Sequence, residues 1–141
     1  MAFEHEGRAE QSKAAVRRWL DAKALCQQEH WQGAMYLAGY AVECRLKAKL
    51  MEMHRVVTLS ALAEKLRRRR SEVELGTHSI ESLLDLTGAR HRLDPEAERA
   101  FRQCNTWKVS WRYSPRAGDE MACKEFLNAV DRFSRFIQNS I

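Results

Sequence analysis

The chain has 141 residues, and its 24 Lys and Arg outnumber its 19 Asp and Glu, which gives a net charge of +5. Its 45% hydrophobic and 30% charged residues are typical of a folded globular protein and exclude a disordered chain. No apolar run reaches the roughly 18 residues of a membrane span and no signal peptide is evident, so we expect a cytoplasmic protein that makes no membrane contact.

Helical spacing dominates the chain, which has only two prolines and six glycines and no sustained strand-like alternation. We therefore predict an all-α fold, an up-and-down bundle of four to five helices, as a single domain over residues 1–141. The four cysteines are far apart and lack Cys-x-x-Cys spacing, which favours reduced thiols over disulfides or a metal site. No cofactor is expected, because glycine-rich phosphate loops and serine-nucleophile motifs are missing.

The first two predicted helices are joined by a short break. Apolar residues repeat with helical spacing from Ala15 to Cys26, which predicts a helix over about 8–28. A second helix is predicted over about 31–53, because this segment lacks proline and ends in good helix formers. A connection this short favours an antiparallel hairpin.

One stripe of the second helix is polar and places Glu43 between Tyr40 and Lys47, with apolar stripes on both sides. A carboxylate in such a position is costly to bury unless it is paired. Arg112 is the predicted partner, because it lies among aromatic residues and a guanidinium meets a carboxylate with two hydrogen bonds. The remaining side of the helix is predicted to face solvent and holds Ala34, Ala38, Arg45 and Lys49.

Residues 55–76 have the least regular pattern, with a short helix predicted over about 61–70. Its end carries the run Arg67–Arg70. This run is interpreted either as a solvated helix end, where cations suit the C-terminal dipole, or as a phosphate-binding patch.

Capping signals predict three further helices. Thr77 or Ser79 is the candidate N-cap of the first, and Asp94 followed by Pro95 is typical of the start of the second. Aromatic residues at helical spacing extend the second helix to about Ser110. The three helices are predicted over about 80–88, 95–110 and 119–138.

Three segments resemble HEPN-domain proteins of bacteria and archaea. The run Tyr36–Ala48 resembles the second helix of that family, and Thr77–Ile80 resembles its histidine-led helix. Trp107 with Trp111–Pro115 is similar to its Trp…Arg-Tyr segment. The resemblance implies a helical bundle that is usually a homodimer, with residues 55–76 as a variable insertion. It also implies a toxin–antitoxin, phage-defence or nucleotidyltransferase-partnered setting.

Many members of that family cut RNA in a groove at the dimer interface, with an arginine and a histidine separated by four to six residues. No arginine in this chain is followed by a histidine at that spacing. We therefore expect a non-catalytic, homodimeric binding or regulatory module with a nucleotidyltransferase-type partner. The alternative is a divergent ribonuclease whose candidate catalytic residues are His78 and Arg112.

A polar pocket for a nucleotide or an RNA phosphate is the functional interpretation of these residues. The arginine and lysine would bind phosphate, the tyrosines would stack on a base, and the histidine would move a proton. The structural alternative is an ion pair that locks two helices, with the histidine as a helix-capping residue. The candidate ligand-binding residues are Tyr40, Glu43, Lys47, His78, Arg112 and Tyr113.

Overall fold

The computed structural model describes residues 7–68, 78–114 and 118–141. Within these ranges the chain forms six α-helices and two short 3-10 helices, and its only β pairing is an isolated bridge between Gly7 and Thr58. The predicted all-α class is therefore confirmed, whereas the described ranges hold six α-helices and not the predicted four to five. None of the helices in these ranges combines the length and the apolar character that a membrane crossing requires.

The observed helices begin and end close to the predicted positions. Ser79, Asp94 and Asp119 cap three of them, since each side chain accepts a hydrogen bond from a backbone N–H three residues later. Gly88 ends one helix in the left-handed conformation, with φ of 69°. The elements are α1 (Arg8–Gln27), α2 (Trp31–Met53), α3 (Leu59–Arg68), α4 (Ile80–Thr87), η1 (Arg90–Arg92), α5 (Pro95–Cys104), η2 (Val109–Tyr113) and α6 (Glu120–Ser140).

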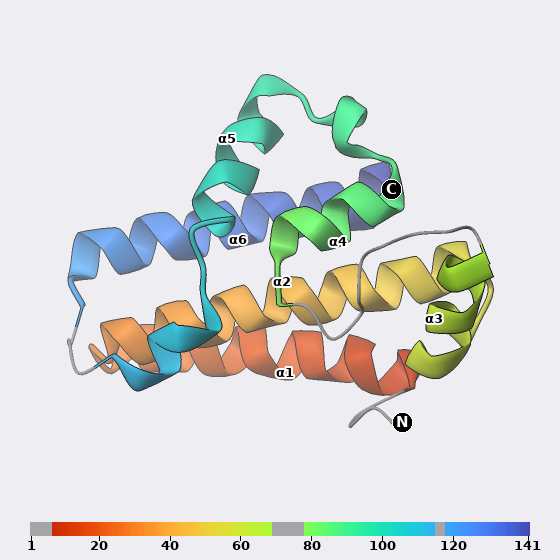
Figure 1. Ribbon diagram of the computed structural model, residues 1–141. Helices are drawn as coiled ribbons and strands as arrows, with labels where there is room; N and C mark the ends of the chain where they lie inside the picture. Colours follow the sequence, from red (N-terminus) through yellow and green to blue (C-terminus); the bar gives the residue numbers. More distant parts are fainter. Residues whose placement is uncertain (1–6, 69–77, 115–117) are drawn as a thin grey trace.

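Helix α2 is the centre of the molecule (Figure 1). It forms an antiparallel hairpin with α1, and α6 packs against α2 and runs in the same direction. Helices α4 and α5 cover the opposite side from α1, and α3 lies at the end of the hairpin. The core is built from large apolar side chains that are less than 2% exposed, among them Phe101, Phe133, Leu46, Leu50 and Ile80.

The side of α2 that was predicted to face solvent is covered, so that prediction is wrong. Ala34 and Ala38 are fully buried, and Arg45 and Lys49 are partly buried. Small side chains lie here because α2 is packed between α1 and α6, and alanine allows helices to approach closely. Periodicity within one helix does not reveal how many neighbours that helix has.

Helix α5 is shorter than predicted, because it ends at Cys104 and not near Ser110. The chain then turns so that the indole of Trp107 packs on Gly39 of α2, where an added Cβ would overlap the ring. The Trp107 Nε1 donates a hydrogen bond of 3.0 Å to the carbonyl oxygen of Tyr36. This tertiary contact overrides the helical spacing of the aromatic residues.

The segment predicted as a variable insertion contains an ordered helix. Helix α3 buries Leu59, Leu62 and Leu66. Arg67 and Arg68 at its end are exposed and form ion pairs with Glu64. The other two arginines of the predicted patch, Arg69 and Arg70, and the alternative N-cap Thr77 lie outside the described residues.

Candidate functional site

Glu43 is a buried carboxylate at the middle of α2, as the sequence predicts. Its side chain is only 3% exposed. The residues on either side of it, Val42 and Cys44, are also buried, so this turn of α2 is shielded from solvent. A charged group in such a place requires partners for both of its oxygens.

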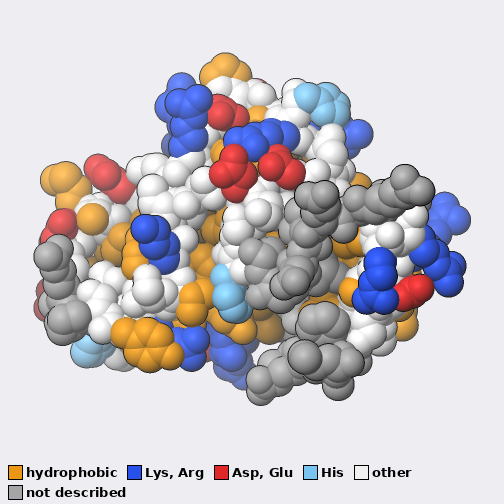
Figure 2. Space-filling model, in the orientation of Figure 1, with side chains coloured by type: hydrophobic (Ala, Val, Ile, Leu, Met, Phe, Trp, Pro, Cys, Tyr) orange, Lys and Arg blue, Asp and Glu red, His pale blue; other side chains and the backbone are white. Residues whose placement is uncertain are grey.

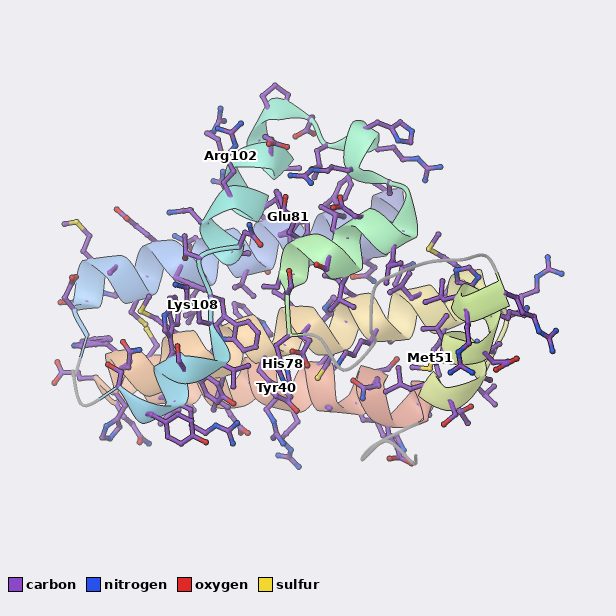
Figure 3. All side chains as sticks on the ribbon, in the orientation of Figure 1. Tyr40, Met51, His78, Glu81, Arg102 and Lys108 are labelled. Carbon is purple, nitrogen blue, oxygen red and sulfur yellow. The ribbon has the colours of Figure 1, made fainter. Side chains whose placement is uncertain are left out.

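Both carboxylate oxygens of Glu43 have such a partner. Lys47, one turn further along α2, brings its Nζ to 3.2 Å from Oε2. His78 brings its Nδ1 to 2.6 Å from Oε1. The predicted pairing with Arg112 is therefore not the one formed, because Lys47 and His78 already occupy the two oxygens. Figure 3 shows His78 beside Tyr40, at the middle of α2.

His78 links this buried carboxylate to the protein surface. It lies immediately before Ser79, the N-cap of α4, and its side chain is 50% exposed. An ionised carboxylate only accepts hydrogen bonds, so Nδ1 carries the proton. Among the residues that the structure describes, Nε2 has no hydrogen-bond partner. This ring nitrogen is therefore presented as a base or as a ligand-binding atom.

Tyr40 lies one turn before Glu43 on the same side of α2. Burial, and then the neighbouring Cys44 and Glu43, raise the pKa of its phenol, so the hydroxyl stays protonated. The guanidinium of Arg18, from α1, lies 5.9 Å from the centre of the Tyr40 ring. The aromatic ring beside His78 thus carries a cation close to it.

Cys44 is not a nucleophile at this site. Burial, and then the nearby Glu43, raise the pKa of its thiol to about 12. The thiolate form is therefore scarce at neutral pH, and the thiol acts as a small apolar group.

An aromatic surface continues from Tyr40 toward η2. Tyr36 stacks on Trp107 with ring centres 6.0 Å apart. The Arg112 guanidinium lies 5.7 Å from the centre of the Tyr36 ring and 5.4 Å from that of Tyr113. Arg112 and Tyr113 are both exposed, which leaves them accessible to a ligand.

The structure brings some of the predicted site residues together and separates others. Tyr40, Glu43, Lys47 and His78 form one cluster. Arg112 contacts α2 at Tyr36, seven residues before Glu43, which is a rise of about 10 Å along the helix. His78 and Arg112 therefore contact α2 two helical turns apart within one chain.

Arg18 is a site residue that the sequence analysis did not single out. It lies between Ala15 and Ala22, which are both fully buried on the α2-facing side of α1. The sequence did contain a sign of this role, because Arg18 interrupts the apolar stripe of α1. A charged side chain in that position is expected to contact the neighbouring helix.

Within the described part of the chain, no three His, Cys, Asp or Glu side chains gather closely enough to hold a metal ion. Figure 2 shows basic and hydrophobic side chains next to one another over the α1–α2 hairpin.

Comparison of the chain with models of known protein families, with curated proteins and with solved structures found no match.

Proposed function

We propose that this chain is a HEPN-like helical module that binds RNA or a nucleotide as a homodimer. The binding surface is the face formed by Arg18, Tyr36, Tyr40, His78 and Arg112. A nucleotidyltransferase-type partner in a toxin–antitoxin or defence system is the proposed setting, which rests only on the family resemblance of the three sequence segments.

The observation that carries the proposal is the anchoring of an exposed histidine on a buried carboxylate. Ordering the half-exposed His78 costs side-chain entropy, and the 2.6 Å bond to Glu43 fixes its orientation before any ligand arrives. The half-exposed imidazole then lies beside Tyr40 (Figure 3).

The composition of this face suits nucleic acid. Tyr40 and Tyr36 offer aromatic rings, and exposed Tyr113 adds a third that bases can stack on. Arg18 and Arg112 each lie over one of these rings, where their positive charge is close to the phosphate of a stacked nucleotide. The net charge of +5 favours a polyanionic ligand.

The test is fluorescence anisotropy with labelled single-stranded RNA at several salt concentrations. We expect His78→Ala and Arg112→Ala to weaken binding, and Arg112→Ala to reduce the salt slope by about one. Matched controls are His91→Ala and Arg102→Ala, since both residues are exposed and outside this face. Equal RNA affinity of wild type, His78→Ala and Arg112→Ala would remove the proposal.

The geometry of His78 also favours a second candidate, a divergent ribonuclease. A histidine with Nδ1–H on a carboxylate, whose Nε2 has no hydrogen-bond partner within the described ranges, is arranged as a general base for an RNA 2′-hydroxyl. Because His78 and Arg112 of one chain contact α2 about 10 Å apart, a shared site needs Arg112 of the partner subunit.

A cleavage assay with mixed variants separates the two candidates. If the site is shared across a dimer, His78→Ala and Arg112→Ala are each inactive alone. Mixing them then restores part of the activity, since one site of each mixed dimer is intact. RNA binding without cleavage at high protein concentration leaves the binding module as the function.

A further inference from the structure

A polar pocket lies on the side of α2 facing away from Glu43. It has a volume of about 550 Å³ and lies between the start of α1, the second half of α2 and the end of α6. Its polar lining comes from Arg8, Ser12, Arg45, Lys49, Glu52 and Gln138. Three cations and one carboxylate leave this lining with a net charge of two positive.

Arg45 is the unusual member of this group. It is only partly exposed, and its Nε is buried without a hydrogen-bond partner among the residues that the structure describes. Desolvation lowers the pKa of its guanidinium. Arginine at such depth is normally paired with a carboxylate or a phosphate, because its charge and its donors otherwise lose their water without compensation.

The nearby carboxylates are engaged elsewhere. Glu43 is two residues away on α2, which turns its side chain by about 200° to the opposite side of the helix. Glu52 is 65% exposed and lies 3.6 Å from Lys49, with which it forms an ion pair. Neither carboxylate pairs with Arg45, so this guanidinium has no acidic partner in the part of the chain that the structure describes.

We propose that this pocket binds a phosphate group, either as inorganic phosphate or as the phosphate of a small phosphorylated metabolite. The planar fork of Arg45 would donate two parallel hydrogen bonds to two phosphate oxygens. Lys49 on α2 and Arg8 on α1 approach from different helices, which suits an ion with oxygens on every side. The Ser12 hydroxyl adds a neutral donor.

This site is independent of the one proposed for RNA. It uses no residue of the face around His78, and it lies on another side of α2. A small anion fits it better than a polynucleotide, because the key donor is partly buried within the pocket. Its test is therefore independent of RNA binding.

The test is the melting temperature of the protein in inorganic phosphate, with ionic strength held constant by chloride. We expect phosphate to raise the melting temperature of the wild type, since a ligand that binds only the folded state stabilises it. Arg45→Met keeps a similar apolar stem without the charge, and we expect it to weaken phosphate binding by about tenfold or more. Arg17→Met is the matched control, because Arg17 is exposed on α1 and lies outside this pocket.

Arg45→Met is expected to fold at least as well as the wild type without phosphate, because it removes an unpartnered guanidinium. Arg45→Lys retains the charge and loses the fork, so we expect intermediate binding. A wild type that does not respond to phosphate, or an Arg45→Met variant that responds as the wild type does, overturns the proposal.

Two further ligands identify the source of the phosphate. Ribose 5-phosphate that binds more tightly than inorganic phosphate points to a phosphorylated metabolite, and the reverse order points to the free ion. Ribose alone is the control, and a shift as large with ribose as with its phosphate would contradict a phosphate site. Phosphate should change the backbone amide shifts of α1, α2 and α6 around the pocket, and it should change them to the same extent in His78→Ala.

Discussion

Glu43, Lys47 and His78 form a small buried-to-exposed network at the centre of α2. The carboxylate and the ammonium are 3% and 9% exposed, whereas the imidazole is 50% exposed. The contribution of this network to the free energy of unfolding therefore depends mainly on the buried Glu43 carboxylate and Lys47 ammonium. Removing one of them leaves the other charge buried and unpaired.

We expect Glu43→Ala to lower the free energy of unfolding by roughly 3–5 kcal/mol, because it leaves the Lys47 ammonium buried without its partner. Urea denaturation at neutral pH measures this change. Glu98→Ala is the control, since Glu98 pairs on the surface with Arg102, which is 76% exposed, and such pairs contribute about 1 kcal/mol or less.

Replacing both charges offers a sharper check of the same idea. Glu43→Leu combined with Lys47→Met fills the space with apolar atoms and leaves neither charge unpaired. The double variant should therefore be more stable than Glu43→Ala. Equal destabilisation by the single and double changes would show that packing, and not unpaired charge, explains the loss.

At the scale of elements, the contact between α2 and the segment before η2 depends on one glycine. Gly39 is buried, and the Trp107 ring occupies the position that a Cβ would take. The Trp107 indole then reaches the carbonyl of Tyr36. This contact places η2, with Arg112, beside the aromatic residues of the candidate site.

Gly39→Ala is expected to destabilise the fold by about 1–3 kcal/mol, because the ring must move to make room for the methyl group. Thermal unfolding and tryptophan fluorescence measure the effect. Gly33→Ala on the same helix is the control, since its Cβ would lie 3.5 Å from Leu25, an ordinary contact. That change should be neutral or stabilising by up to about 1 kcal/mol, as expected from helix propensity.

The packing of Trp107 on Gly39 also affects the position of Arg112 in the candidate site. If Trp107 is displaced, η2 shifts and Arg112 loses its position over Tyr36. RNA affinity should then fall in Gly39→Ala and remain unchanged in Gly33→Ala. The same melting temperature for both glycine variants would contradict the close packing of Trp107 on α2.

At the scale of the whole molecule, α2 is shared by nearly every other element. It packs against α1, α3, α4, α6 and η2, so the fold cannot lose α2 without losing its core. Helix α3 has a different position, because it lies at the end of the hairpin and is anchored by three leucines. Stability should therefore differ strongly between these two helices.

Hydrogen–deuterium exchange is the measurement of this difference. We expect the central amides of α2, around Val42 to Leu46, to exchange only through global unfolding, with the same dependence on denaturant as the equilibrium transition. Amides of α3 should exchange through local opening, with much weaker dependence. Equal protection of α2 and α3 would show that the molecule opens as one unit.

Much of the fold was predictable because local rules governed it. The bounds of α2 match the prediction of 31–53, and the caps Ser79, Asp94 and Asp119 lie where side-chain chemistry places them. The burial of Glu43 followed from its place between two apolar stripes. The partner of Glu43 was predicted wrongly, because a choice among distant cations depends on how the helices pack.

The sequence by itself determined the helical class, the bounds of α2, the capped starts of three helices and the need of Glu43 for a partner, because spacing, capping and desolvation act within a few residues. Only the tertiary structure decided that His78 is one of its two partners and that α5 ends before Trp107. It also decided that Arg45 lines a pocket and does not face open solvent. These outcomes depend on contacts between residues far apart in the chain, where packing overrides local preference.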